Sequence, residues 1–145
     1  MQALRRRPHG AAGFSLIELL LVIVIIGILA SIAIPLYVGS RSRAKNADVR
    51  TGARAIAIAL YSYVLEAKDE GDGDPWPARC DQATLAAYLP ASEWPRNPFR
   101  DGAPMEQVDE ARLGDYGYVR ETGGPEPRKY HVVAYLDGQE PFVVP

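Results

Sequence analysis

The feature that most constrains this chain is a run of twenty residues, Leu19 to Val38, that contains no charged side chain. As an α-helix rising about 1.5 Å per residue it is about 30 Å long, the thickness of a bilayer's hydrocarbon core. We therefore predict a membrane-spanning helix. A cleaved signal peptide is the main alternative, but its apolar region is only about 7 to 15 residues long and ends at a small-x-small site. Here the run is longer and leads into a further helical pattern.

The residues before this run come in an unusual order. A short leader containing Arg5 to Arg7 is followed by Gly13 and then by Phe14-Ser15-Leu16-Ile17-Glu18. An acidic side chain deep in a bilayer costs roughly 2.5 to 3.5 kcal/mol, and somewhat less near the end of a span. Glu18 therefore either pairs with a positive group or lies hydrated at the level of the lipid headgroups. Its position alone leaves both alternatives open.

The segment Gly13-Phe14-Ser15-Leu16-Ile17-Glu18 resembles the processing motif of type IV prepilins and type II secretion pseudopilins. The resemblance covers residues 5 to 38, where the basic leader, the glycine, the aromatic residue, the glutamate and Pro35 follow the family's order. It implies cleavage after Gly13 by a membrane-embedded prepilin peptidase and N-methylation of Phe14. It also implies that Glu18 pairs with the terminal ammonium of a neighbouring subunit during filament assembly.

The chemistry of such a pair is reasonable. An ammonium on Phe14 and a carboxylate on Glu18 are each costly in a dry environment and become tolerable together. Because desolvation offsets much of the Coulomb attraction, the pair would select one axial register more than it would add stability. We expect Glu18→Ala to harm assembly more than membrane insertion.

Gly27 and Pro35 are the two weak points of the predicted span. Pro35 has no amide hydrogen and its ring clashes with the carbonyl of Ser31, so we expect the helix to kink or open locally there. A kink without consequence is one interpretation, because spanning helices tolerate proline. The family resemblance implies instead that this stretch loosens when subunits leave the membrane and pack into a filament.

Beyond Val38, apolar residues recur at alternating steps of four and three, which predicts an amphipathic helix to about Lys68. They are Val49, Ala53, Ile56, Leu60, Tyr63 and Ala67. Turn formers and acidic residues from 69 to 75 end this helix. Among them, Asp72-Gly73-Asp74 is reminiscent of a calcium loop but lacks the spaced ligands and terminal glutamate of an EF-hand. No metal site is predicted.

The rest of the chain predicts a short helix, a loop and three strands. Asp81 can cap a helix from Thr84 to Leu89, which Pro90 ends. An irregular loop from Trp94 to Gly102 is expected to pack Trp94 and Phe99 against a sheet. The strand-like runs are 116–120, 129–136 and 141–144, with turns at Gly123-Gly124-Pro125 and Asp137-Gly138.

We therefore predict an α+β fold in which a long amino-terminal helix packs on a small antiparallel sheet. The resemblance implies a pilin-like ladle with this helix as its handle. The expected organisation is a leader peptide at 1–13, a transmembrane and assembly helix at 14–38, and an extracytoplasmic head at 39–145 that includes the second half of the helix.

Composition argues against several other function classes. Residues 69–145 hold fifteen acidic and seven basic side chains, which repel a phosphate backbone, so no nucleic-acid partner is predicted. Cys80 is the only cysteine, which excludes an intrachain disulfide, and we interpret it as a small core residue. His9 lies in the leader and His131 in a strand, with no nucleophile-base arrangement, phosphate loop or dinucleotide motif beside them. We predict neither catalytic residues nor a cofactor.

Three functions fit this pattern: a filament subunit of a type IV pilus, the major pseudopilin of a type II secretion system, or a singly anchored membrane protein with an extracytoplasmic binding head. The apolar carboxy-terminal segment, residues 139–145, slightly favours the pilus, because major pseudopilins tend to end in an acidic, calcium-binding loop.

The resemblance also implies partners and a location. The expected partners are the prepilin peptidase, identical or related pilin subunits, an inner-membrane assembly platform and membrane lipid. The expected location is the cytoplasmic (inner) membrane, crossed once with the leader in the cytoplasm, and later a filament outside the cytoplasm or at the cell surface.

Overall fold

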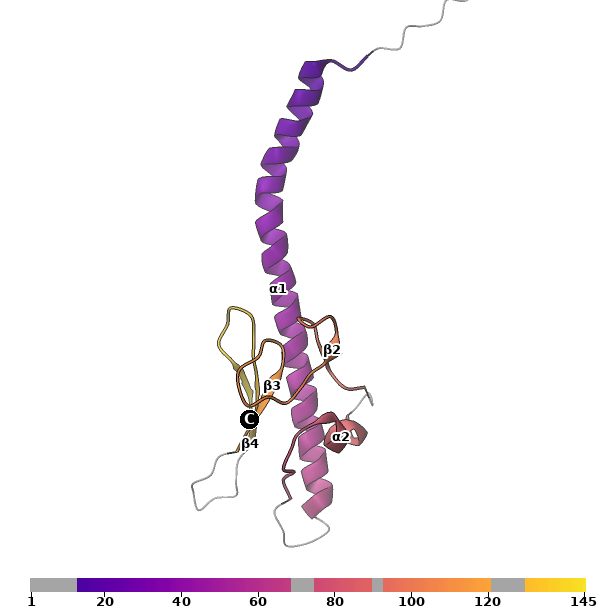
Figure 1. Ribbon diagram of the computed structural model, residues 1–145, viewed down its shortest axis with the longest axis vertical. Helices are drawn as coiled ribbons and strands as arrows, with labels where there is room; N and C mark the ends of the chain where they lie inside the picture. The colour runs from indigo at the N-terminus through magenta and orange to yellow at the C-terminus, as the bar shows by residue number, and fades with distance from the viewer. Residues whose placement is uncertain (1–12, 69–74, 90–92, 121–129) are drawn as a thin grey trace, which may run out of the picture. The chain divides into compact units, whose positions relative to one another are not determined.

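The computed structural model describes residues 13–68, 75–89, 93–120 and 130–145 (Figure 1). In chain order the elements are α1 (Leu16–Lys68), α2 (Gln82–Leu85), the 3-10 helix η1 (Ala86–Tyr88), β1 (Arg96–Asn97), β2 (Ala103–Pro104), β3 (Tyr116–Arg120), β4 (Tyr130–Ala134) and β5 (Phe142–Val144). The chain divides into two compact units, residues up to Gly39 and residues from Ser40 onward. The fold is α+β, as predicted.

The first unit contains the apolar part of α1. By length and composition, α1 is the one described helix that could cross a bilayer, and none of the described residues buries its apolar window. The helix continues through Pro35 without a break, so the expected local opening is absent from this structure. One missing amide hydrogen removes one hydrogen bond, and the turns on either side hold the helix. Loosening at Gly27 and Pro35 during assembly stays a prediction.

In the second unit, called the head below, α1 turns one face into the core. Val49, Ala53, Ile56 and Leu60 are all buried, which confirms the periodicity predicted from the sequence. Tyr63 and Ala67, the last two positions of that stripe, are half-buried. The buried face is wider than the stripe and also includes Gly52, Ala57, Ala59 and Val64.

The head's main sheet is antiparallel with the order β3-β4-β5. Its register places Tyr118 opposite Val132, and Val132 opposite Val144. In β4, Tyr130, Val132 and Ala134 are buried and alternate with half-buried residues. All three predicted strands are present, with ends within two residues of the prediction. Gly138, in the predicted turn before β5, has a φ of 61°, which favours glycine. The predicted turn at 123–125 lies outside the described residues.

The loop from Trp94 to Gly102 differs from the prediction, because β1 and β2 pair as a short antiparallel ladder there. Asn97 is fully buried and organises this hairpin: its side-chain oxygen accepts from the Phe99 amide at 2.9 Å, and its side-chain nitrogen donates to the Leu113 carbonyl at 3.0 Å. Trp94 is buried with its ring centre 6.4 Å from that of Tyr116 in β3, as expected, whereas Phe99 packs against the core and lies beneath Lys45 of α1.

The short helix is also present, with a different end. The Asp81 carboxylate accepts a hydrogen bond from the Thr84 amide at 3.1 Å, so Asp81 is the N-cap as predicted. The helix begins at Gln82 and tightens after Leu85 into η1. Cys80, just before this cap, is fully buried in the core as predicted, and this burial raises the pKa of its thiol to about 12.

Candidate processing and assembly site

The motif residues form the first turn of α1. The Ser15 backbone N–H donates to Glu18 Oε2 at 2.8 Å, and the Ile17 N–H donates to Ser15 Oγ at 3.3 Å. This reciprocal pattern is that of a capping box, in which a serine and a glutamate three residues later satisfy amides that have no partner in the helix. The Ser-x-x-Glu spacing is the sequence signal for such a cap.

Glu18 therefore has a partner inside its own chain. The carboxylate lies at the amino-terminal end of α1, where the helix dipole also stabilises a negative charge. Only Oε2 is engaged; Oε1 makes no hydrogen bond within the described residues. Phe14, the predicted new amino terminus, is 85% exposed. The arrangement leaves Glu18 able to accept one further positive group from outside the chain.

Gly13 and Gly27 are not required by packing within the chain. A Cβ added at either position would meet nothing within 4 Å, the backbone of the surrounding helix aside for Gly27. If these glycines are needed for steric reasons, the need comes from a contact with another molecule.

The apolar part of α1 packs against no other segment that the structure describes. Its large side chains are exposed from Leu16 to Val38, and the least exposed of them, Val22, is still 45% exposed. The hydroxyl of Ser31 donates to the Ile28 carbonyl at 2.7 Å, so this polar group is satisfied within the helix. The segment therefore needs lipid or protein around it.

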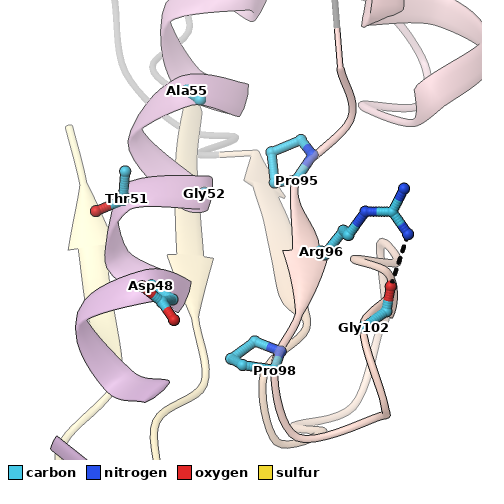
Figure 2. A pocket seen from close by; sticks show the side chains of 8 residues that line it. All are labelled: Asp48, Thr51, Gly52, Ala55, Pro95, Arg96, Pro98 and Gly102. Carbon is cyan, nitrogen blue, oxygen red and sulfur yellow. Dashed lines mark hydrogen bonds between the residues drawn. The ribbon is translucent and has the colours of Figure 1, made fainter. Parts of the chain in front are cut away.

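The head carries a pocket of about 460 Å³ between α1 and the β1–β2 hairpin (Figure 2). Asp48, Thr51, Gly52 and Ala55 line it on the α1 side, and Pro95, Arg96, Pro98 and Gly102 line it on the hairpin side. Its two charged residues are Asp48 and Arg96, and the Arg96 guanidinium donates to the Gly102 carbonyl at 3.2 Å. No nucleophile-base pair lies among these lining residues.

Two further polar contacts hold the head together and were not predicted. The Asn46 side chain pairs with the Asp137 backbone, donating to its carbonyl and accepting from its amide, both at 2.9 Å. Buried Asp115 accepts from Arg112 Nε at 2.6 Å, from Arg100 Nη1 at 3.2 Å and from the Glu106 amide at 2.9 Å. The contact of Asn46 with Asp137 joins residues that are 91 positions apart in the sequence. The contacts of Asp115 use charged residue types that are common on protein surfaces, so the sequence does not single them out.

Within the described ranges, no group of three His, Cys, Asp or Glu side chains is placed to hold a metal ion. The calcium-like segment Asp72-Gly73-Asp74 lies outside them. His131 is half-buried in β4.

Comparison with known proteins identifies the amino-terminal motif. A family model described as the prokaryotic N-terminal methylation motif matches residues 8–34. The type IV major pilin protein PilA of Myxococcus xanthus is 44% identical over 66 residues, which are 46% of this chain and 30% of that protein. The type IV narrow pilus major component PilA5 of Thermus thermophilus is 47% identical over 58 residues, 40% of this chain and 50% of that protein.

A second kind of relative matches more of the chain. The type II secretion system core protein G of Vibrio cholerae is 31% identical over 115 residues, which are 79% of this chain and 74% of that protein. No solved structure gives a significant match. The match to core protein G reaches into the head, whereas this chain spans only 30% and 50% of the two pilins. Three findings support one family: the methylation motif, the relative that is matched over most of its length, and the α+β fold with a long apolar helix. The chain belongs to the type IV pilin and pseudopilin family.

Proposed function

We propose that this chain is the structural subunit of a type IV pilus-like filament, cleaved after Gly13, N-methylated on Phe14, and assembled through its apolar helix. The observation that carries the proposal is the exposed segment from Leu16 to Val38, preceded by a matched methylation motif that contains Gly13, Phe14 and Glu18. An apolar surface of this length needs a bilayer before assembly and other subunits after it.

Cleavage after Gly13 would create an ammonium on Phe14 close to the first turn of α1. In a filament, the free oxygen of Glu18 would accept this ammonium from a neighbouring subunit, while the other oxygen keeps its bond to Ser15. Such a pair fixes the axial register of one helix against the next. Gly27 and Pro35 would let this part of the helix loosen or approach neighbours closely, which the open space around Gly27 supports.

The partners in this proposal are a prepilin peptidase, identical or related subunits, an inner-membrane assembly platform and membrane lipid. The subunit would cross the inner membrane once, with residues 1–13 in the cytoplasm and the head from residue 39 outside, and would then enter the filament. The role is structural and not catalytic, in keeping with relatives that are named as pilins and as a secretion-system core protein.

A second candidate is the major pseudopilin of a type II secretion system. The observation in its favour is that the core protein G match extends over most of the chain, whereas the two pilin matches cover less than half. Subunits recovered in sheared surface filaments favour the pilus, and processed subunits confined to the cell envelope favour the pseudopilus.

The role of Glu18 can be tested with three matched variants. Glu18→Gln keeps an oxygen that can accept from the Ser15 amide but removes the charge, and Glu18→Ala removes both the acceptor and the charge. Ser15→Ala removes only the hydroxyl that accepts from the Ile17 amide and keeps both the Glu18 charge and its bond to the backbone of residue 15. We expect Glu18→Gln and Glu18→Ala to lower filament yield about tenfold or more, because losing one partner leaves a buried charge unpaired. Ser15→Ala should assemble like the wild type.

Membrane levels and the amino terminus of each variant are measured alongside filament yield, so that a loss of cleavage is not taken for a loss of assembly. If Glu18→Gln assembles normally while Glu18→Ala does not, Glu18 acts as a helix cap and the intersubunit pair is wrong. If all three keep wild-type filament yield, Glu18 has no part in assembly.

A further inference from the structure

Three arginines of the head lie on one face of α1. Arg43, Arg50 and Arg54 are separated by seven and four residues, which brings them to the same side of a helix with 3.6 residues per turn. We propose that this arginine stripe binds the carboxylates of Asp109 and Glu110 of a second copy of the chain. The proposal rests on the proposed function, since it supplies a contact between heads in a filament.

The arginine stripe has no acidic partner among the described residues. Every ion pair there is made by Arg79, Arg96, Arg100 or Arg112, none of which belongs to α1. Arg43 donates to the Ser40 hydroxyl at 3.2 Å, and Arg50 donates to the Gln139 side chain at 2.5 Å. Both acceptors are neutral, so three positive charges remain uncompensated.

Arg50 and Arg54 are also held close together. Their guanidinium carbons lie 5.6 and 5.0 Å from the centre of the same ring, that of Phe142 in β5. Stacking on a ring fixes the plane of each guanidinium. Like charges four residues apart on a helix repel one another, and the buried Nε of Arg50 has no acceptor within the described chain. Within the described residues, these two cations are held in place without an anion that would balance them.

A carboxylate of another copy is the anion that fits best. Residues 69–145 carry fifteen acidic and seven basic side chains, so the surface that a second copy offers is predominantly acidic. Asp109 and Glu110 are adjacent, exposed and outside every described ion pair. Arginine matches the geometry of a carboxylate with two parallel hydrogen bonds.

Lipid phosphate fits less well than the acidic surface of another copy. Arg50 and Arg54 follow Val38, the last residue of the apolar run, by 12 and 16 residues, which is several helical turns. Arg41 follows Val38 by only three residues and is the better placed of these basic residues for a headgroup contact.

The test is a matched pair of charge reversals in the full-length protein expressed in its own cells. Arg54→Glu changes the arginine stripe at an exposed residue with no hydrogen bond in the described chain. Arg41→Glu is the control: it is equally exposed, lies on the same helix, and points about 140° away from Arg54. We expect Arg54→Glu to lower the yield of sheared filaments about tenfold or more, because like charges then face each other. Arg41→Glu should leave it within about twofold.

A second-site reversal then identifies the partner. Adding Asp109→Lys and Glu110→Lys to a variant that carries Arg43→Glu and Arg54→Glu should restore filament yield, because a stripe of net charge −1 then faces two lysines. The two arginine reversals alone, and the two lysines alone, should each lower it. Thermal melting, membrane level and the amino terminus of each variant are measured to show that folding and processing are intact. The salt concentration is held constant in these comparisons. Added salt should release wild-type subunits sooner than subunits of the restored variant only if the exchanged charge pairs are more buried than the original ones.

The outcomes separate this inference from the proposed function. Wild-type filament yield from Arg54→Glu would overturn the arginine stripe, as would equal losses from Arg54→Glu and Arg41→Glu, which point to lipid or to overall charge. Failure of the lysine pair to restore assembly would overturn the assignment of Asp109 and Glu110. If the wild-type chain forms no filament of any kind, the proposed function itself is wrong.

Discussion

Glu18 has a role within its own chain that is compatible with the role proposed for it in the filament. Its Oε2 accepts from the Ser15 amide and caps α1, so the carboxylate is oriented before any other subunit arrives. An oriented group loses less conformational freedom when it binds a second partner. The cap therefore supports, and does not replace, a role for Glu18 between subunits.

The Glu106 carboxylate lies between Arg100 and Arg112, at 3.0 Å from a nitrogen of the first and 2.5 Å from a nitrogen of the second. Hydrogen bonds from Arg100 and then from Arg112 lower the pKa of Glu106 below its usual value of 4.5. Because the pKa is lower in the folded state, the stabilisation is fully present above the unfolded value and is lost as the pH falls through the folded value. The head should lose stability below about pH 4.5.

Thermal melting between pH 7 and pH 3, followed by tryptophan fluorescence, checks this prediction. Glu106→Gln should melt at a lower temperature than the wild type at pH 7, and the difference should shrink at acid pH. The melting temperature of Glu106→Gln should still fall at acid pH, because hydrogen bonds from Thr84 also lower the pKa of Asp81. A difference between variant and wild type that stays constant from pH 7 to pH 3 would show that the Glu106 charge does not contribute.

At the scale of elements, two of the three glycines in α1, Gly39 and Gly52, differ in the space around them. A Cβ on Gly52 would lie 2.6 Å from Met105 Sδ and 2.9 Å from Pro95 Cβ, whereas a Cβ on Gly39 would meet nothing within 4 Å. Gly52→Ala should destabilise the head by about 1–3 kcal/mol through overpacking. Gly39→Ala should stabilise the helix by up to about 1 kcal/mol, since alanine is the better helix former.

Urea unfolding of the detergent-solubilised full-length protein measures both changes. The two substitutions are chemically identical and lie on the same helix, so their difference reports the contact between α1 and the β1–β2 hairpin. Equal effects of the two variants would mean that this hairpin does not pack against Gly52 as described.

Elements with a local, periodic pattern could be predicted from the sequence, and those that depend on distant contacts could not. The α1 stripe from Val49 to Leu60 follows a period of 3.6, and burial in β4 alternates with a period of 2. The β1–β2 ladder depends on Asn97, whose side chain reaches Leu113, and a sequence pattern does not show which polar residue will be buried. The same holds for Asn46, which contacts Asp137 from 91 residues away.

The candidate site divides in the same way. The motif from Gly13 to Glu18 is contiguous and was visible in the sequence, and its Ser-x-x-Glu cap could have been predicted from spacing alone. The arginine stripe could be recognised as a basic face of a helix. The structure was needed to show that Arg50 and Arg54 share the Phe142 ring and that neither is paired.

At the scale of the whole molecule, the chain combines an apolar amino-terminal segment, which no other described residue buries, with a head that has a core of its own. Glu106 and Asp115 of the head form ion pairs with Arg100 and Arg112, whereas the arginines of α1 form no ion pair with any residue that the structure describes. Both the exposed apolar helix and the uncompensated charge are features of a subunit that is completed by its neighbours.

The central claim is that this chain is processed into a filament subunit, and its amino terminus tests that most directly. Intact-mass spectrometry of the protein from native membranes and from sheared surface fractions gives this terminus. We predict a mass that begins at Phe14 and carries one added methyl group, found in the sheared fraction for a pilus and in the envelope alone for a pseudopilus. An uncut chain beginning at Met1, in cells that contain the prepilin peptidase, would contradict the account and leave a singly anchored membrane protein.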